Sequence, residues 1–145
     1  MTAAAAAKLA AGVEGLQPLL GRYGFVCADV GVGPFAAAAF VRGDRELRLW
    51  LRGDSLSVSY RIGTLEIDHA SFMRELLGPG GPNRFPTYDD DARPAFDALR
   101  HDLETHCGDF LDGAGDDLRR CAAAAAYDVR LSGAQRLARI ERQLG

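Results

Sequence analysis

The chain has 145 residues, the usual length of one domain, and it can bury a hydrophobic core without help from disulfides or metal ions. Its hydrophobic share of 48% and charged share of 26% are typical of a globular protein. A net charge of −3 argues against a general nucleic-acid-binding protein, which would carry a strong basic excess. No apolar run approaches the roughly 20 residues that a membrane-spanning helix needs. We therefore expect a single domain over residues 1–145, without a membrane or nucleic-acid partner.

The chain has three cysteines, which is an odd number, and no two of them have a CxxC spacing. This pattern indicates neither a disulfide framework nor a cysteine zinc site. The opening segment, Thr2 to Ala11, lacks the basic and strongly apolar regions of a secretory signal. These features predict a cytoplasmic protein in which Cys27, Cys107 and Cys121 are small buried hydrophobic residues.

The first predicted element is a helix, followed by four strands. The helix has one apolar face, formed by Leu9, Val13, Leu16 and Leu20. The strands are predicted over Phe25–Val30, Phe35–Arg42, Arg45–Arg52 and Ser55–Ile62. Gly43-Asp44 and Gly53-Asp54 join the last three strands and suit two-residue hairpin loops, because glycine tolerates a positive φ.

These two loops also predict a register, which can be checked against the side-chain pattern. The predicted pairs are Leu51 with Leu56, Leu49 with Val58, Leu47 with Tyr60, Phe40 with Leu47, and Ala38 with Leu49. All of them fall on one face of the sheet, which we therefore expect to be buried.

The rest of the chain is predicted to be helical. Asp68 is a typical N-cap for a helix that ends at Gly78-Pro79, and a second helix begins near Pro94. Two more helices are indicated by the apolar positions Leu118, Cys121, Ala125 and Val129, and then Leu137, Ile140 and Leu144. The predicted fold is α+β: an N-terminal helix, a four-stranded antiparallel meander, and about four helices packing on the face of Leu47, Leu49 and Leu51.

The opposite face of the predicted sheet carries Arg48, Trp50 and Arg52, between the small residues Ala37, Ala39, Ser57 and Ser59. A tryptophan with guanidinium groups on both sides can stack a ring, a base or a partner side chain. The alternatives are a contact with a protein or a second copy, and a structural face on which arginine stems pack against the indole. On the same face Glu46 is expected opposite Arg61, so one basic residue has a cross-strand partner.

The three histidines raise the question of catalysis. Sequence neighbours on a helix point in different directions, so His101 beside Asp102 and His106 beside Cys107 are not dyads. His101 and His106 are five residues apart and are expected to diverge, whereas a metal pair favours a spacing of three or four. We predict no catalytic residue, metal ligand or cofactor. It stays open whether folding brings His69 close to His101 or His106.

An acidic stretch follows a Gly/Pro-rich loop. Between Asp89 and Asp117 the chain has ten acidic residues against two arginines. Carboxylates beside aromatic side chains suit the docking of a basic protein, and the predicted docking residues are Phe85, Tyr88, Asp89, Asp90 and Asp91. In the alternative, the basic last helix, with Arg136, Arg139 and Arg142, covers this surface.

Three strings of the sequence carry a resemblance: Tyr23-Gly24-Phe25, the segment from Asp68 to Arg74, and Phe85-Pro86-Thr87-Tyr88-Asp89-Asp90 followed by Phe96-x-x-Leu99-x-x-Asp102-Leu103. In this order they resemble small uncharacterised bacterial proteins of about this length, some of which are similar to immunity proteins of toxin systems. The resemblance implies a binding role and no catalytic residues.

The sequence therefore predicts a non-enzymatic protein-binding domain with a basic protein partner, and neutralisation of a toxin is one form of that role. Self-association is compatible with it. The first alternative is a small-ligand or anion-binding domain that uses Arg48, Trp50 and Arg52. The second is a hydrolase or transferase that uses the histidines.

Overall fold

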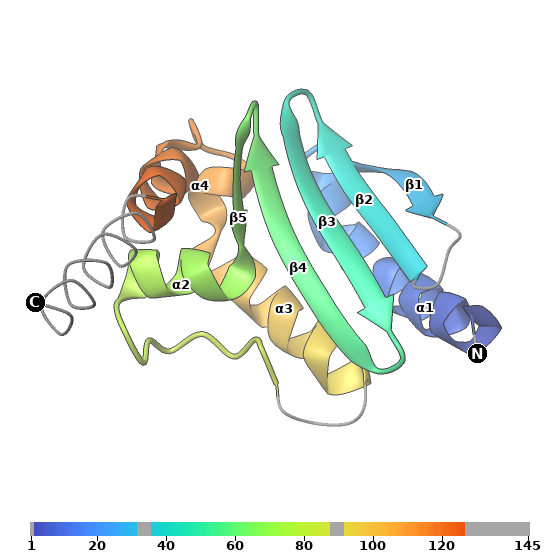
Figure 1. Ribbon diagram of the computed structural model, residues 1–145. Coiled ribbons are helices and arrows are strands. Elements are labelled where there is room, and N and C mark those ends of the chain that lie inside the picture. Colours follow the sequence, from blue (N-terminus) through green and yellow to red (C-terminus); the bar gives the residue numbers. More distant parts are fainter. Residues whose placement is uncertain (1, 32–35, 88–91, 127–145) are drawn as a thin grey trace, which may run out of the picture.

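The computed structural model describes residues 2–31, 36–87 and 92–126. It is an α+β arrangement in which two long helices, α1 (Thr2–Arg22) and α3 (Ala92–His106), lie on one face of an antiparallel sheet. Figure 1 shows this sheet from its other face, with the two helices behind it. Among the described helices, none combines the length and apolar character needed to cross a bilayer.

The five strands follow one another in space as they do along the chain. They are β1 (Val26–Gly31), β2 (Ala36–Arg42), β3 (Arg45–Arg52), β4 (Ser55–Ile62) and β5 (Leu65–Asp68). All neighbouring strands are antiparallel, and β1 has a register shift between Cys27 and Asp29. The sheet is thus a meander with β1 and β5 at its edges.

The predicted register of β2, β3 and β4 is confirmed. Leu49 lies opposite both Ala38 and Val58, and Leu47 lies opposite both Phe40 and Tyr60. Both connecting turns place a glycine at positive φ, Gly43 at 59° and Gly53 at 63°. Turn chemistry and the alternation of side chains therefore specify the same pairing.

The prediction of four strands missed β5. Gly63, at a φ of 60°, begins a third two-residue turn, and the four residues after the turn pair with β4. This strand is short, and its last residue, Asp68, also caps the next helix by accepting a hydrogen bond from the Ser71 backbone N–H at 3.0 Å. A helix cap at the end of so short a run hides the strand from a search for alternating residues.

The helices after the sheet begin as predicted. Helix α2 (His69–Leu77) ends at Gly78, and α3 is followed at once by a short helix, α4 (Gly108–Leu111). Residues 116–126 are helical as well, with Leu118 and Cys121 completely buried. The predicted last helix, together with Val129, lies outside the described residues.

The hydrophobic core lies between the sheet and the helices. The predicted core face of β3 is confirmed, because Leu47, Leu49 and Leu51 have no exposed surface. Cys107 and Cys121 are buried as predicted, whereas Cys27 is half-buried. Helices α1 and α3 thus occupy one side of the sheet, and the side chains of Arg48, Trp50 and Arg52 belong to the other side.

Candidate functional site

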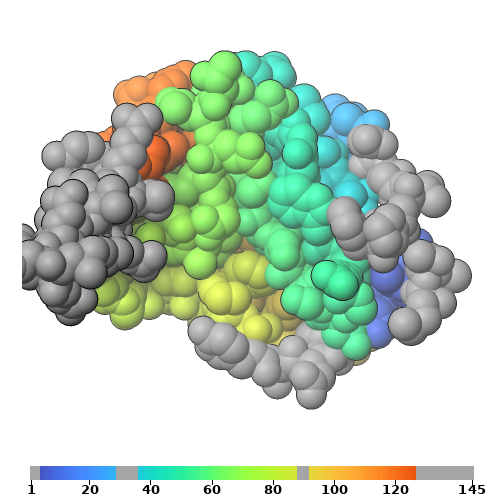
Figure 2. Space-filling view, in the orientation of Figure 1, coloured from blue at the N-terminus to red at the C-terminus, as the bar shows by residue number. Residues whose placement is uncertain are grey.

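Trp50 lies on the outer face of the central strand, β3, where the register places Ala37 and Ser57 directly beside it. These neighbours are too small to cover the indole, which is half-buried. Figure 2 shows this face in the orientation of Figure 1, with side chains of β3 and β4 at the surface of the molecule. The predicted arrangement of a tryptophan between small residues is therefore present.

Glu46 holds two arginines of this face together. Its carboxylate accepts a hydrogen bond from Arg48 Nε and another from Arg61 Nη2, each at 2.6 Å. Burial raises the pKa of the Glu46 carboxyl, but the hydrogen bonds and charges of Arg61 and Arg48 outweigh this, so its pKa lies below the ordinary value. The predicted cross-strand pair of Glu46 and Arg61 is confirmed, and Arg48 shares the same carboxylate.

The two other predicted residues of this face differ in their surroundings. The guanidinium of Arg48 lies 5.6 Å from the centre of the Trp50 ring, a cation–π distance. Arg52 is exposed, lies opposite Ser55, and forms no ion pair with any residue that the structure describes. The positive charge that sits against the indole is thus already compensated by Glu46.

Two hollows flank Trp50. One, of about 410 Å³, is lined by the Ala37 and Ala39 side of the face together with Glu46 and Arg48. The other, of about 550 Å³, extends over β4 and β5 to the helix of residues 116–126. The second hollow carries the carboxylates of Glu66 and Asp68, and neither is ion-paired within the described ranges. The indole is therefore a ridge between two depressions.

The predicted aromatic docking loop is not confirmed at its first residue. Phe85 is 5% exposed and its ring packs edge-on against His69, with the centroids 5.2 Å apart. Its backbone N–H also donates to Asp102, at 2.8 Å, which pulls this part of the loop into the protein. Phe85 is therefore a core residue, and its prediction as an exposed contact was wrong. Tyr88, Asp89, Asp90 and Asp91 lie outside the described residues.

A buried polar chain connects the sheet to α3. Tyr60 Oη lies 2.6 Å from His69 Nδ1, and His69 Nε2 lies 2.9 Å from a carboxylate oxygen of Asp102. The backbone N–H groups of Arg84 and Phe85 donate to the same carboxylate. None of the three side chains in this polar chain is more than 1% exposed.

The charges of this polar chain follow from its burial. Burial raises the pKa of Asp102, but hydrogen bonds from His69 and from the Arg84 and Phe85 backbones outweigh it, so that its pKa lies below the ordinary value. Burial, with nearby Cys107 and Asp102, raises the pKa of Tyr60 well above its ordinary value. Asp102 is therefore ionised and accepts a hydrogen bond from His69 Nε2–H, and a second hydrogen bond joins His69 Nδ1 to the Tyr60 hydroxyl.

The same burial decides what the polar chain can do chemically. It has the order of groups found in general-base systems, but its side chains are enclosed and present no atom to a substrate. Cys107 lies 3.9 Å from Tyr60 Oη, and burial raises the pKa of its thiol to about 12, so it is not an activated nucleophile. The polar chain therefore connects β4, α2 and α3 inside the core.

The prediction that His101 and His106 diverge was wrong. Their ring centres lie 6.2 Å apart, in an edge-to-face arrangement. His106 is the last residue of α3, and Asp102 lies one helical turn before it at the i, i+4 spacing that brings side chains together. The prediction considered only the five-residue separation of the two histidines and did not consider Asp102, which lies between them.

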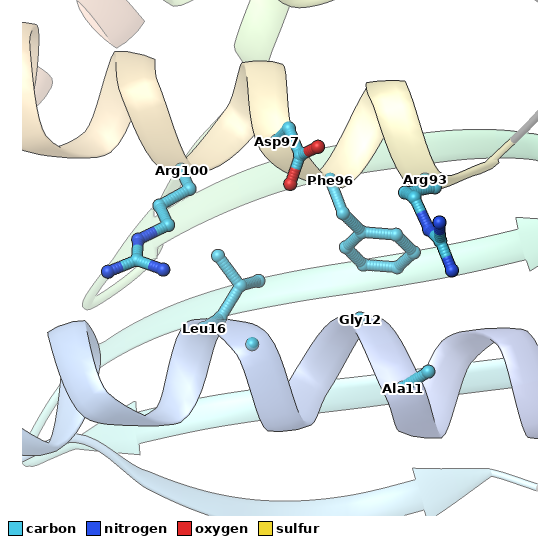
Figure 3. Close-up of a pocket in the computed structure, with 8 residues that line it drawn as sticks. Ala11, Gly12, Leu16, Arg93, Phe96, Asp97 and Arg100 are labelled. Atoms are coloured by element: carbon cyan, nitrogen blue, oxygen red, sulfur yellow. The ribbon is translucent and has the colours of Figure 1, made fainter.

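A separate cleft of about 320 Å³ lies between α1 and α3, bounded by Arg93 and Arg100 on α3 (Figure 3). Phe96 points from α3 towards Gly12 of α1. A Cβ at Gly12 would overlap the Phe96 ring, so glycine at this position sets how closely the two helices approach. Arg100 is ion-paired with Glu104 at 3.0 Å.

Comparison with family models, curated proteins and solved structures gives no match to this chain.

Proposed function

We propose that this chain is a non-enzymatic protein-binding domain whose partner docks on the outer face of the sheet, with Trp50 as the central contact. The observation that carries the proposal is the half-buried indole between two hollows on a face that α1 and α3 leave free. Tryptophan and arginine are among the residues most enriched in the dominant contacts of protein interfaces. Trp50, Arg48 and Arg52 supply both types at one place.

Charge favours a protein over a small anion. An anion site needs uncompensated donors, but Arg48 and Arg61 both donate to Glu46 at 2.6 Å. Only Arg52, at the end of β3, is left among the described arginines of this face. A broad surface with compensated charges and one large aromatic side chain is typical of a protein interface.

The second hollow supports a basic partner. Glu66 and Asp68 line it beside Trp50, and within the described part of the chain no cation neutralises either carboxylate. A lysine or arginine of the partner would meet both charges and the face of the indole there. Neutralisation of a toxin, which the sequence resemblance implies, is one function that such a contact would serve.

The test uses the immobilised full chain and a lysate of its native host. Proteins retained by the wild type are compared, by quantitative mass spectrometry, with those retained by Trp50→Ala and by Gln17→Ala. Gln17 is exposed on α1, in the layer behind the sheet, and is the matched control. The partner is expected to be retained by wild type and Gln17→Ala and lost with Trp50→Ala.

Titration with the purified partner then measures how much Trp50 contributes to the affinity. Loss of a dominant aromatic contact costs ~2 kcal/mol or more, so Trp50→Ala should raise the dissociation constant about 30-fold. Trp50 is the one tryptophan of the sequence, and its fluorescence should change when the partner binds. A partner that binds Trp50→Ala and wild type equally would show that it docks elsewhere and would refute the proposal.

A further inference from the structure

The C-terminal end of α3 gathers three metal-ligating side chains. His101, Asp102 and His106 each present one ligand atom, and these atoms all lie within 4.8 Å of one another. We propose that these three residues form a binding site for a divalent transition-metal ion of the zinc type. The proposal is independent of the outer sheet face, because none of the three residues lines the hollows beside Trp50.

An orphaned nitrogen gives the cluster a second, independent observation. His106 Nε2 is inaccessible to solvent and has no hydrogen-bond partner among the described residues. A buried polar atom without a partner is unfavourable, and an ion or ligand that is bound to it is one explanation for such an atom. Its ring belongs to the same three-residue cluster, so a metal held there accounts for a histidine at this position.

Asp102 is prepared to act as a ligand. One carboxylate oxygen accepts from His69 Nε2 and from the Phe85 backbone, whereas the other accepts from the Arg84 backbone, at 2.8 Å. With one hydrogen bond from the described residues, the second oxygen keeps a lone pair for a metal. The hydrogen bonds also hold the carboxylate in one orientation, as supporting residues do around metal ligands in general.

This role also accounts for the buried polar chain described above. His69 is fixed by the Tyr60 hydroxyl at 2.6 Å and itself fixes Asp102 at 2.9 Å. Burying three polar side chains costs desolvation free energy, and apolar side chains could join a strand to a helix without that cost. They are explained if the Asp102 carboxylate, at the end of this chain, must be held in a fixed position relative to the His101 and His106 rings.

The donor set selects the class of metal. Two imidazole nitrogens and one carboxylate oxygen suit Zn²⁺ and its neighbours, whereas Mg²⁺ and Ca²⁺ favour sites made entirely of oxygen. Zinc bonds of about 2.0–2.2 Å require the ligand atoms to move closer together than 4.8 Å. His101 and His106 are both only half-buried, so their rings have room to rotate towards the ion.

The first test is a calorimetric titration of chelator-treated, full-length protein with zinc chloride. We expect one equivalent to bind, with affinity falling on the order of 10–100-fold or more in His101→Ala and in His106→Gln. Magnesium chloride should give no heat of binding. Asp97→Asn, an exposed carboxylate elsewhere on α3, is the matched control and should bind zinc as the wild type does.

The second test takes its main readout from the wild-type protein, so that this readout does not depend on variant folding. In NMR spectra that detect the imidazole nitrogens of the wild type, zinc should shift the signals of the His101 and His106 rings. The signals of the two His69 ring nitrogens should show no metal bonded to that ring. Cys27→Ser removes the half-buried thiol as a competing ligand and should not alter the titration. The proposal is overturned if zinc leaves both ring signals in place, or if Cys27→Ser abolishes binding.

Discussion

The ring of Phe96 in α3 lies against the backbone of Gly12 in α1, where a side chain would overlap it. Three residues further along α1, a Cβ added to Gly15 would meet no described atom within 4 Å outside its own stretch of helix. Two glycines on the same helix therefore differ in what their surroundings allow, and only the first is required by packing.

Alanine at the two positions should have opposite effects. Gly15→Ala is expected to stabilise the fold by ~0.5–1 kcal/mol, because alanine loses less backbone entropy in a helix. Gly12→Ala gains the same helix propensity but forces Phe96 to move, and overpacking of this kind costs about 1–3 kcal/mol. Denaturant unfolding of both variants measures the difference, and equal stabilisation would show that α1 and α3 are less closely packed than described.

The two faces of β3 can be distinguished by substitution of adjacent residues. Leu49→Asp buries an unpaired charge in the core and should unfold the protein, with a cost of ~4 kcal/mol or more. Trp50→Ser acts on the outer face and should cost far less. The melting temperatures of the two variants check this, and comparable large losses would mean that the outer face is covered as well.

Acid should weaken the cluster around Glu46. The pKa of this carboxyl is lower in the folded protein than its ordinary value of 4.5, so its stabilising contribution is complete above that value and is lost as the pH falls through the folded pKa. At pH 7, Glu46→Gln should destabilise by about 1 kcal/mol, since both arginines that it binds are partly exposed.

Stability curves from pH 7 to pH 3 test this linkage. The wild type and Glu46→Gln should differ at neutral pH and converge at the acid end. Glu104→Gln is the control, because Glu104 belongs to an exposed ion pair with Arg100, and such pairs contribute little. A gap between wild type and Glu46→Gln that stays constant down to pH 3 would contradict the assignment.

The buried polar chain from Tyr60 to Asp102 should be sensitive to loss of its carboxylate. Asp102→Ala leaves three donors without an acceptor and should cost on the order of 3–5 kcal/mol. Tyr60→Phe removes one hydrogen bond and should cost about 1–3 kcal/mol. Urea unfolding ranks the two, and the reverse order would show that Asp102 is solvated in the folded state.

The parts of the fold that sequence could predict are those set by neighbouring residues. The Gly43 and Gly53 turns determine the pairing of Leu49 because hairpin register depends on a few residues and on the period of two along a strand. The strand β5 was missed because four residues ending in a helix cap carry too little of that alternation.

The candidate sites also differ in whether they depend on residues that are close together in the sequence. The outer face around Trp50 was predictable, since its residues follow from strand alternation. The contact of His69 with Asp102 joins residues 33 positions apart, and no spacing rule covers such a pair. Phe85 was misplaced for the same reason, because its burial depends on a carboxylate in another helix.

The order of the strands also bears on how the protein folds. Every strand of the sheet pairs with its neighbours along the chain, and β2, β3, β4 and β5 are connected by two-residue turns. Closing such short loops costs little entropy, and a low sequence separation of contacts goes with rapid folding. The contacts of α1 with α3 across the core join parts of the chain that are far apart in sequence. We therefore expect the hairpins to form early, and the docking of these two helices to set the rate at which the native core is completed.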